Sequence, residues 1–172
     1  MIAPSRIADD LLPVGDGQEE AAQILTLRLG RGVFGIPVRH VREVLDVAPI
    51  TPVANAPASL LGIIDVRHEG VPVIDLKQRL RIAGDDAAGS RDRRIVVLEI
   101  EAEGAPTVIA IIADAVLEVV EHDPAALDRP PSLGERWDDS FIHGIGRRMG
   151  EFMTLLDVSA IFGRAPFGQP AA

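Results

Sequence analysis

The sequence contains no cysteine and no tyrosine, and it has only one tryptophan and five phenylalanines among its 172 residues. The absence of cysteine excludes disulfide bonds, zinc sites with thiolate ligands and cysteine nucleophiles. Because aromatic residues are so few, the hydrophobic core has to be built from aliphatic side chains. Valine and isoleucine are abundant, and their β-branched side chains favour strands over helices. The composition therefore predicts a β-rich protein.

Positive charge is also scarce. The 26 acidic residues outnumber the 17 basic ones, which gives a formal net charge of -9, and Lys77 is the only lysine. An acidic chain repels nucleic-acid phosphates and anionic membrane surfaces. We therefore expect proteins or cations as partners, and no nucleic acid.

Long apolar runs are absent as well. No stretch approaches the roughly 18 residues that a membrane-spanning helix needs. Residues 1–20 lack the basic start and the apolar centre of a secretory signal. These observations predict a soluble, cytoplasmic protein without direct membrane insertion.

The residue pattern divides the chain into three parts. Residues 1–22 contain prolines, glycines and five acidic side chains without a sustained period, which predicts a flexible acidic tail. Residues 23–163 carry the apolar patterns of a folded domain, and residues 164–172 are expected to be a C-terminal tail. A domain of this length can bury a substantial core.

Short apolar segments separated by turn residues predict strands throughout residues 23–163. The segments are 24–29, 33–36, 60–66, 71–74, 95–100, 107–112, 116–120, 141–145 and 152–156. Helices are predicted only at Val38–Leu45, where apolar residues recur at helical spacing, and at 76–82 and 157–162. Such short helices cannot be the crossovers of a doubly wound sheet. We therefore predict a mainly all-β fold of two small antiparallel barrels, one in each half of the domain.

Four aliphatic runs end on aspartate, at Asp65, Asp75, Asp114 and Asp157. Paired carboxylates can act as acid and base catalysts. Aspartates after strands also cap turns and helices by accepting backbone N–H bonds, and Asp75 and Asp157 each precede a predicted helix. We favour capping as the role of these aspartates. The similarity of the four runs is faint, and we do not interpret it as an internal repeat.

The four histidines, His40, His68, His122 and His143, lack the spacing of metal ligands on one helix or strand. The P-loop lysine and the G-x-S-x-G nucleophile elbow are also missing. We therefore expect no enzyme activity, no cofactor and no metal. Trp137 lies in an acidic, proline-rich segment, where it either caps a barrel or anchors a partner.

Six sequence blocks occur in an order and spacing that resemble the CheW family of chemotaxis coupling proteins. They are Phe34-Gly35-Ile36-Pro37, Val41-Arg42-Glu43-Val44, Gly62-Ile63-Ile64-Asp65-Val66-Arg67, Val71-Pro72-Val73-Ile74-Asp75-Leu76, Ala113-Asp114-Ala115-Val116-Leu117-Glu118-Val119 and Leu155-Leu156-Asp157-Val158. The resemblance spans residues 23–163. It implies a fold of two SH3-like five-stranded antiparallel β-barrel subdomains with a few short helices. It also implies a bacterial scaffold without catalysis, which couples the cytoplasmic tips of chemoreceptors to the regulatory domain of a CheA-type histidine kinase in signalling arrays.

The resemblance also implies a set of partner-binding residues. Glu43 and Arg67 match a glutamate on the predicted short helix and an arginine before a turn, and a charge pair between them would join helix to hairpin. Positions where the family contacts receptor and kinase match Val41, Gly62, Ile95, Val116 and Val119. The family often has N-L-R-G at the turn, whereas this chain has Asp65-Val66-Arg67-His68. His68 must therefore either adopt the left-handed conformation of a glycine or change the turn.

A second hypothesis places the chain in a different functional class. A small-ligand-binding or catalytic β-barrel could use Asp65, Asp114 and a histidine in a groove between the two barrels. A concave polar pocket with converging carboxylates would favour this hypothesis. A compact aliphatic core in both barrels would favour the scaffold.

Overall fold

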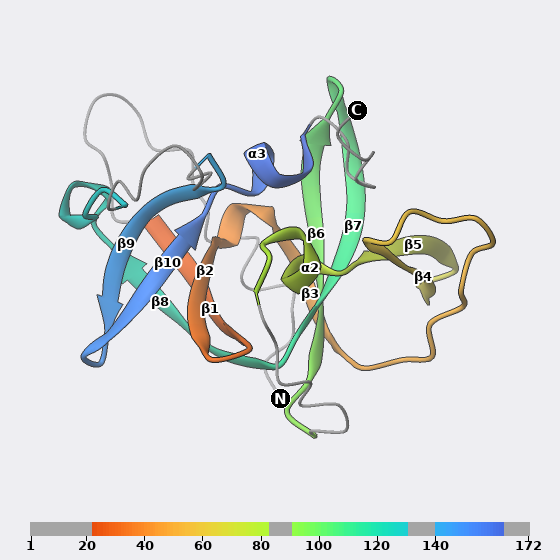
Figure 1. Cartoon of the computed structure of the whole chain (residues 1–172), viewed down its shortest axis with the longest axis horizontal. Helices are drawn as coiled ribbons and strands as arrows, with labels where there is room; N and C mark the ends of the chain where they lie inside the picture. The colour runs from red at the N-terminus through yellow and green to blue at the C-terminus, as the bar shows by residue number, and fades with distance from the viewer. Residues whose placement is uncertain (1–21, 83–90, 131–139, 164–172) are drawn as a thin grey trace.

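Two five-stranded sheets make up most of the protein in the computed structural model, which describes residues 22–82, 91–130 and 140–163 (Figure 1). The elements in chain order are β1 (Ala22–Leu29), β2 (Gly32–Pro37), η1 (Val38–His40), β3 (Val41–Asp46), β4 (Leu60–Val66), β5 (Glu69–Ile74), α2 (Leu76–Arg79), β6 (Arg94–Ala102), β7 (Ala105–Ala113), β8 (Ala115–His122), η2 (Pro124–Ala126), β9 (Ile142–Arg148), β10 (Glu151–Leu156) and α3 (Val158–Phe162). The predicted mainly all-β fold with a few short helices is confirmed. The expectations for both tails and for Trp137 lie outside the described residues.

Each sheet combines strands from both halves of the chain. The first sheet, which forms the first subdomain, has the strand order β8-β1-β2-β10-β9. The second sheet, which forms the second subdomain, has the order β3-β6-β7-β5-β4. In Figure 1 the orange β1 and β2 accordingly lie beside the blue β9 and β10. The prediction that each half forms its own barrel is therefore wrong. Local patterns predict hairpins, but which hairpins share a sheet depends on contacts between residues far apart in sequence.

Two strand pairs are parallel. β10 pairs with β2 through three residue pairs, and β5 pairs with β7 through two. The expectation of purely antiparallel barrels is corrected at these two places. Each parallel pair joins two hairpins that are distant in the chain, so no tight turn forces the neighbouring strands to run in opposite directions.

The two halves of the chain nevertheless repeat one arrangement of elements. Each strand of one half has an equivalent five strands further along the chain: β1 corresponds to β6, β2 to β7, β3 to β8, β4 to β9 and β5 to β10. When each strand is replaced by its equivalent, the order β3-β6-β7-β5-β4 becomes β8-β1-β2-β10-β9, which is the order of the first sheet. Equivalent helices α2 and α3 are capped by Asp75 and Asp157, whose Oδ1 atoms accept from Gln78 N at 3.2 Å and Ala160 N at 3.0 Å. Capping by these two aspartates is confirmed. Of the four runs that end on aspartate, only those at Asp75 and Asp157 occupy equivalent places, so the repeat is one of topology, which the sequence did not predict.

The segment Val38–Leu45 does not form the predicted helix. After the short η1 turn the chain continues as β3, which pairs with β6. Side chains along β3 alternate between half-buried and exposed, and Val41 and Glu43 lie on the half-buried face. Valine-rich sequence has weak helix propensity, so the hydrogen bonds offered by β6 decide the conformation. Glu43 thus lies on a strand.

Helix α2 ends earlier than predicted. Arg81 has a φ of 54°, and the backbone N–H groups of Arg81 and Ile82 donate to the carbonyls of Gln78 and Lys77 at 3.1 and 2.9 Å. This pattern is a Schellman motif, in which the residue after the helix is left-handed. A left-handed arginine therefore ends the helix inside the predicted range 76–82.

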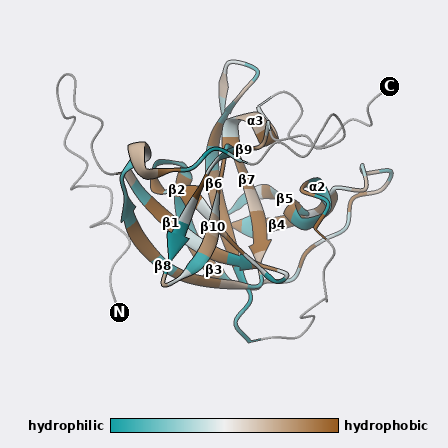
Figure 2. Ribbon diagram, turned by 60° about the vertical axis from the view of Figure 1, so that its left-hand side comes forward, coloured by the Kyte–Doolittle hydropathy of each residue, from teal (hydrophilic) through white to brown (hydrophobic). Residues whose placement is uncertain are grey.

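One apolar core connects the two subdomains (Figure 2). It includes Leu27 of β1, Ile74 of β5, Leu98 of β6 and Phe162 of α3. Smaller clusters fill the remaining interior of each subdomain. Phe162 is the one aromatic side chain among the buried core residues in the described part of the chain, which confirms the predicted aliphatic interior.

Candidate partner-binding surface

The β4–β5 turn is built from two residues in left-handed conformation. Val66 pairs with Glu69, so Arg67 and His68 alone form the turn, with φ of 51° and 68°. These angles are typical of a type I′ turn, whose twist matches that of the flanking strands. Asp65 stabilises the turn because its Oδ1 accepts a hydrogen bond from His68 N at 2.8 Å. His68 therefore adopts a left-handed conformation itself, and the turn is shorter than the segment 67–70 left between the two predicted strands.

We expect His68→Gly to stabilise the protein by about 0.5 to 1 kcal/mol, because glycine removes the steric cost of a left-handed residue at the second turn position. Urea unfolding would measure the change. Glu69→Gly is the matched control: Glu69 lies in β5, so glycine there should destabilise. Equal or lower stability of the His68→Gly variant would contradict the expectation.

The predicted charge pair is formed. Arg67 Nη2 lies 2.9 Å from Glu43 Oε2, and the side chains of Arg67 and Glu43 are 76% and 10% exposed. β3 and β4 are the two outer strands of their sheet. The pair therefore joins the two edges of the second sheet, and next to it Thr51 and Ile63 exchange backbone hydrogen bonds of 2.9 and 2.8 Å. The contact lies between strand β3 and the turn of the β4–β5 hairpin, so the predicted hairpin side is correct and only the predicted helix is replaced by a strand.

Gly62 of β4 lies against the segment that follows β3, at the bridge between Thr51 and Ile63. Its φ is 150°, and a Cβ atom at this position would lie 2.3 Å from the carbonyl oxygen of Thr51. Glycine is required here by backbone contact. The sequence proposed Gly62 as a partner contact, and the structure gives it a further role in closing the sheet.

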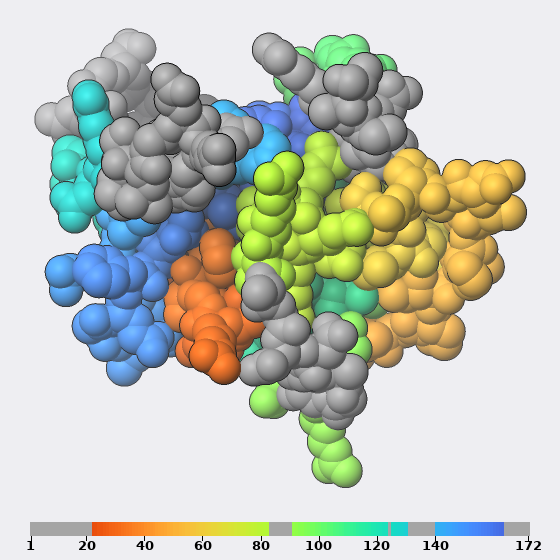
Figure 3. Space-filling model, viewed as in Figure 1, coloured from red at the N-terminus to blue at the C-terminus, as the bar shows by residue number. Residues whose placement is uncertain are grey.

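Exposed aliphatic side chains lie around the place where the two edges of the second sheet meet. They are Val44, Val47, Val53, Leu61 and Ile63, each 38–44% exposed. In Figure 3 this region, from residue 47 to the β4–β5 hairpin, projects at the right of the molecule. Sequence reasoning missed Leu61 and Ile63 because β4 is apolar on both faces, a pattern that is also typical of fully buried strands.

The other proposed contact positions lie in several environments. Val41 is half-buried on β3, and Val116 is half-buried on β8. Val119 is 50% exposed on β8, which belongs to the first subdomain. Ile95 is fully buried in the core of the second subdomain, so a partner cannot reach its side chain in this structure. The reason is that this part of β6 is buried on both faces, since the four side chains from Ile95 to Leu98 are all buried.

The carboxylates of the ligand-binding hypothesis do not form a common site. Asp65 is engaged in the β4–β5 turn. Asp114 is buried and forms an ion pair of 2.8 Å with Lys77 Nζ. Each carboxylate thus has a structural contact in a different part of the molecule.

A pocket of about 190 Å³ at the first subdomain is lined by three histidines, His40, His122 and His143, and by Asp157. Burial lowers the pKa of His40, and the charge of Arg39 lowers it further. Asp157 caps α3. No group of three histidine, aspartate or glutamate side chains within the described residues is arranged to hold a metal ion. The pocket lies below the range of about 300 to 1,000 Å³ usual for ligand sites, and neither Asp65 nor Asp114 lines it.

Within the described ranges, the helices are all too short or too polar to span a bilayer.

Comparison with known proteins gives consistent relatives. The family model for the CheW-like domain matches residues 23–165. The chemotaxis protein CheW of Treponema pallidum is 27% identical over 150 residues, which cover 84% of both chains. Protein FrzA of Myxococcus xanthus is 29% identical over 141 residues, covering 81% of this chain and 84% of FrzA. The solved structure of the scaffolding protein TtCheW from Thermoanaerobacter tengcongensis superimposes with a TM-score of 0.72 at 28% identity, over 88% of this chain and 94% of that one.

Proposed function

Because the chain belongs to the CheW family of chemotaxis coupling proteins, we propose that it joins the cytoplasmic tips of chemoreceptors to the regulatory domain of a CheA-type histidine kinase. It acts by protein–protein binding in the cytoplasm, within arrays that its partners hold at the membrane. No catalytic step is assigned to it.

The observation that carries the proposal is the Glu43–Arg67 pair beside the exposed aliphatic side chains of β3 and β4. Protein interfaces commonly combine an apolar centre with a polar rim, and arginine is frequent among the residues that dominate binding energy. Val44, Leu61 and Ile63 provide such a centre, and Arg67, which is mostly exposed, provides the rim. We call the surface of Glu43, Arg67, Val44, Leu61 and Ile63 the closure surface, and we assign one partner to it.

The second partner requires a separate surface, because an adaptor has to hold both partners together. We assign it to β8 of the first subdomain, where Val119 is exposed and Val116 is half-buried. β8 is an outer strand of its sheet. Val41 and Gly62 support the closure surface from β3 and β4.

We expect Glu43→Lys and Arg67→Glu each to weaken binding to the partner at the closure surface at least about tenfold, which corresponds to about 1.4 kcal/mol. Folding should stay intact in Arg67→Glu, because Arg67 is mostly exposed and a solvent-exposed ion pair contributes only about 0 to 1 kcal/mol to stability. Glu43 is only 10% exposed, so Glu43→Lys is interpreted only if its fold is retained. Co-sedimentation with receptor and kinase arrays measures the loss, and circular dichroism checks the fold.

Two controls separate charge recognition from structural damage. Glu151→Lys changes an exposed glutamate on β10, which belongs to the other sheet, and should bind like the parent. The double variant Glu43→Lys with Arg67→Glu restores an ion pair with reversed polarity and should still bind weakly. Parental binding by both single variants would overturn the assignment of this surface.

A further inference from the structure

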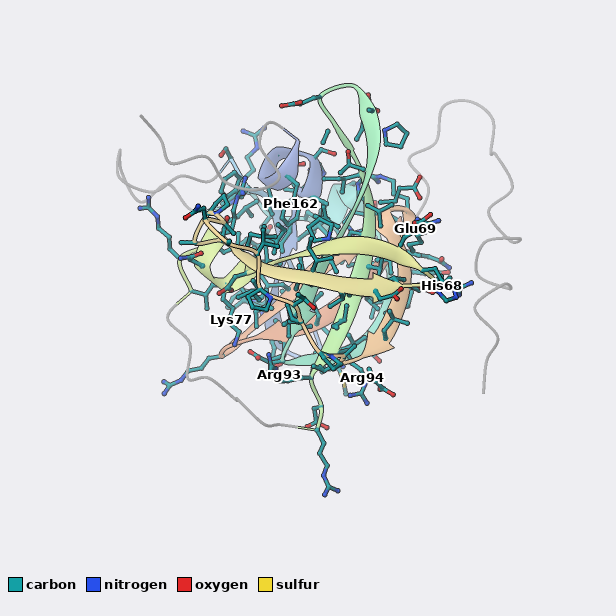
Figure 4. The ribbon with its side chains drawn as sticks, turned by 90° about the vertical axis from the view of Figure 1, so that its right-hand side faces the viewer. His68, Glu69, Lys77, Arg93, Arg94 and Phe162 are labelled. Carbon is teal, nitrogen blue, oxygen red and sulfur yellow. The ribbon has the colours of Figure 1, made fainter. Side chains whose placement is uncertain are left out.

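Lys77, which is labelled in Figure 4, is the only lysine of the sequence. It forms a nearly buried ion pair that the binding surfaces do not use. Its Nζ lies 2.8 Å from Asp114 Oδ1, and the two side chains are 18% and 9% exposed. Asp114 Oδ2 accepts a hydrogen bond of 2.6 Å from Gly30 N, and Asp114 N donates to the carbonyl of Arg28 at 2.9 Å. The carboxylate therefore connects the β1–β2 turn of the first subdomain to helix α2, which follows β5 of the second.

Four other ion pairs among the described residues stay within one subdomain. Arg28–Glu151 and Arg148–Glu118 lie in the first subdomain, and Arg67–Glu43 and Arg94–Asp46 lie in the second. The Lys77–Asp114 pair differs from these four because it crosses from one subdomain to the other.

The duplicated topology does not by itself require this pair. Lys77 follows the capping Asp75 by two residues, and the equivalent residue after Asp157 is Ser159, which is exposed and uncharged. A contact imposed by the repeated arrangement would be expected at both helices. The ion pair is therefore present at α2 and absent at the equivalent position of α3.

We propose that the Lys77–Asp114 pair is a positioning contact that fixes the orientation of the closure surface relative to β8. The shared apolar core holds the subdomains together, but apolar burial is non-directional. Hydrogen bonds from Arg79 Nη2 to the Ile161 carbonyl at 2.6 Å and from Glu103 N to the Gly163 carbonyl at 3.3 Å join the subdomains near α3, whereas the Lys77–Asp114 pair joins them at the β1–β2 turn. In a buried ion pair the attraction offsets the cost of desolvation only where the geometry is good and further hydrogen bonds satisfy the remaining polar atoms, so the pair favours a narrow range of geometries. Lys77 follows the β4–β5 hairpin that carries Arg67, and Asp114 immediately precedes β8.

Distances between spin labels test the contact without any partner, and the cysteine-free chain allows two specific labels. Glu121→Cys on β8 and Glu101→Cys on β6 place one exposed label on each subdomain. Lys77→Met should broaden or shift the distance distribution. Arg148→Met, which breaks a 2.8 Å pair within the first subdomain, should leave it unchanged.

A double variant controls for the possibility that Lys77→Met alone fails to fold. Lys77→Met with Asp114→Asn removes both charges but keeps an acceptor for Gly30 N, and it should broaden the distribution in the same way. A parental distribution in this double variant would overturn the proposal, and so would equal broadening in Arg148→Met.

The consequence for assembly rests on the proposed function. In Lys77→Met, binding of each partner alone should stay near the parental value, whereas the complex with both partners should weaken about tenfold, within the usual range of coupling between sites. Parental assembly by a variant with a broadened distribution would overturn the link to partner positioning. If the parent itself binds neither partner, the proposed function fails, and the label distances still decide whether the contact orients the subdomains.

Discussion

Either half of the chain expressed alone should remain unfolded, and the two halves mixed should recover the parental structure. Residues 1–86 contain β1–β5, and residues 87–172 contain β6–β10. The first half lacks β6 and β7, which occupy the middle of the second sheet, and it lacks three strands of the first sheet. The shared core also takes residues from both halves. Neither fragment can therefore bury its apolar side chains by itself.

Circular dichroism with thermal unfolding would measure this effect. Each fragment should show no cooperative transition, and an equimolar mixture should regain most of the transition of the intact chain, which is the reference in the same buffer. A cooperative transition in one isolated fragment would contradict the conclusion that each sheet needs hairpins from both halves of the chain.

Gly62→Ala should destabilise the protein by about 3 kcal/mol and abolish binding at the closure surface. The new Cβ would meet the Thr51 carbonyl oxygen at 2.3 Å and Ile50 Cγ2 at 2.6 Å, at a φ of 150° that side chains rarely adopt. Overpacking and backbone strain each cost roughly 1 to 3 kcal/mol. Because Thr51 pairs with Ile63, relief of the clash has to move β4 away from this contact and disturb the exposed side chains.

Gly70→Ala is the matched control for Gly62→Ala. A Cβ at Gly70 would meet only Ile63 Cγ2, at 3.3 Å, and its φ is outside the positive region. Its effect on chemical denaturation should stay within about 1 kcal/mol. If Gly62→Ala lost partner binding at parental stability, Gly62 would be a direct contact, as the sequence resemblance proposed, and its structural role would be contradicted.

Hairpins and caps could be predicted because the signals for them are local. Alternating apolar residues on both sides of glycine-rich turns predicted β1–β2 and β9–β10. An aspartate followed by a helical turn predicted the caps at Asp75 and Asp157, which the hydrogen bonds to Gln78 and Ala160 confirm. Each of these features depends on residues within a few positions of one another.

The misassigned segments depend on distant residues. Val38–Leu45 fits a helical period as well as a strand, and its pairing with β6, some 50 residues later in the chain, decided the outcome. Ile95 resembles a family contact position, yet its side chain is fully buried. The duplication escaped notice because the equivalent elements share topology, while residues such as Lys77 and Ser159 differ in chemistry.

The sequence by itself determined an aliphatic β protein, its hairpins, its family resemblance and the two residues of the charge pair at Glu43 and Arg67. Only the tertiary structure decided that this pair joins the two edges of one sheet, that Gly62 is required by the Thr51 carbonyl, and that Lys77 meets Asp114 across the subdomains. The physical reason is that turns and caps form between near neighbours in sequence. Closure of a sheet and the joining of subdomains depend on contacts whose partners only the complete fold brings together.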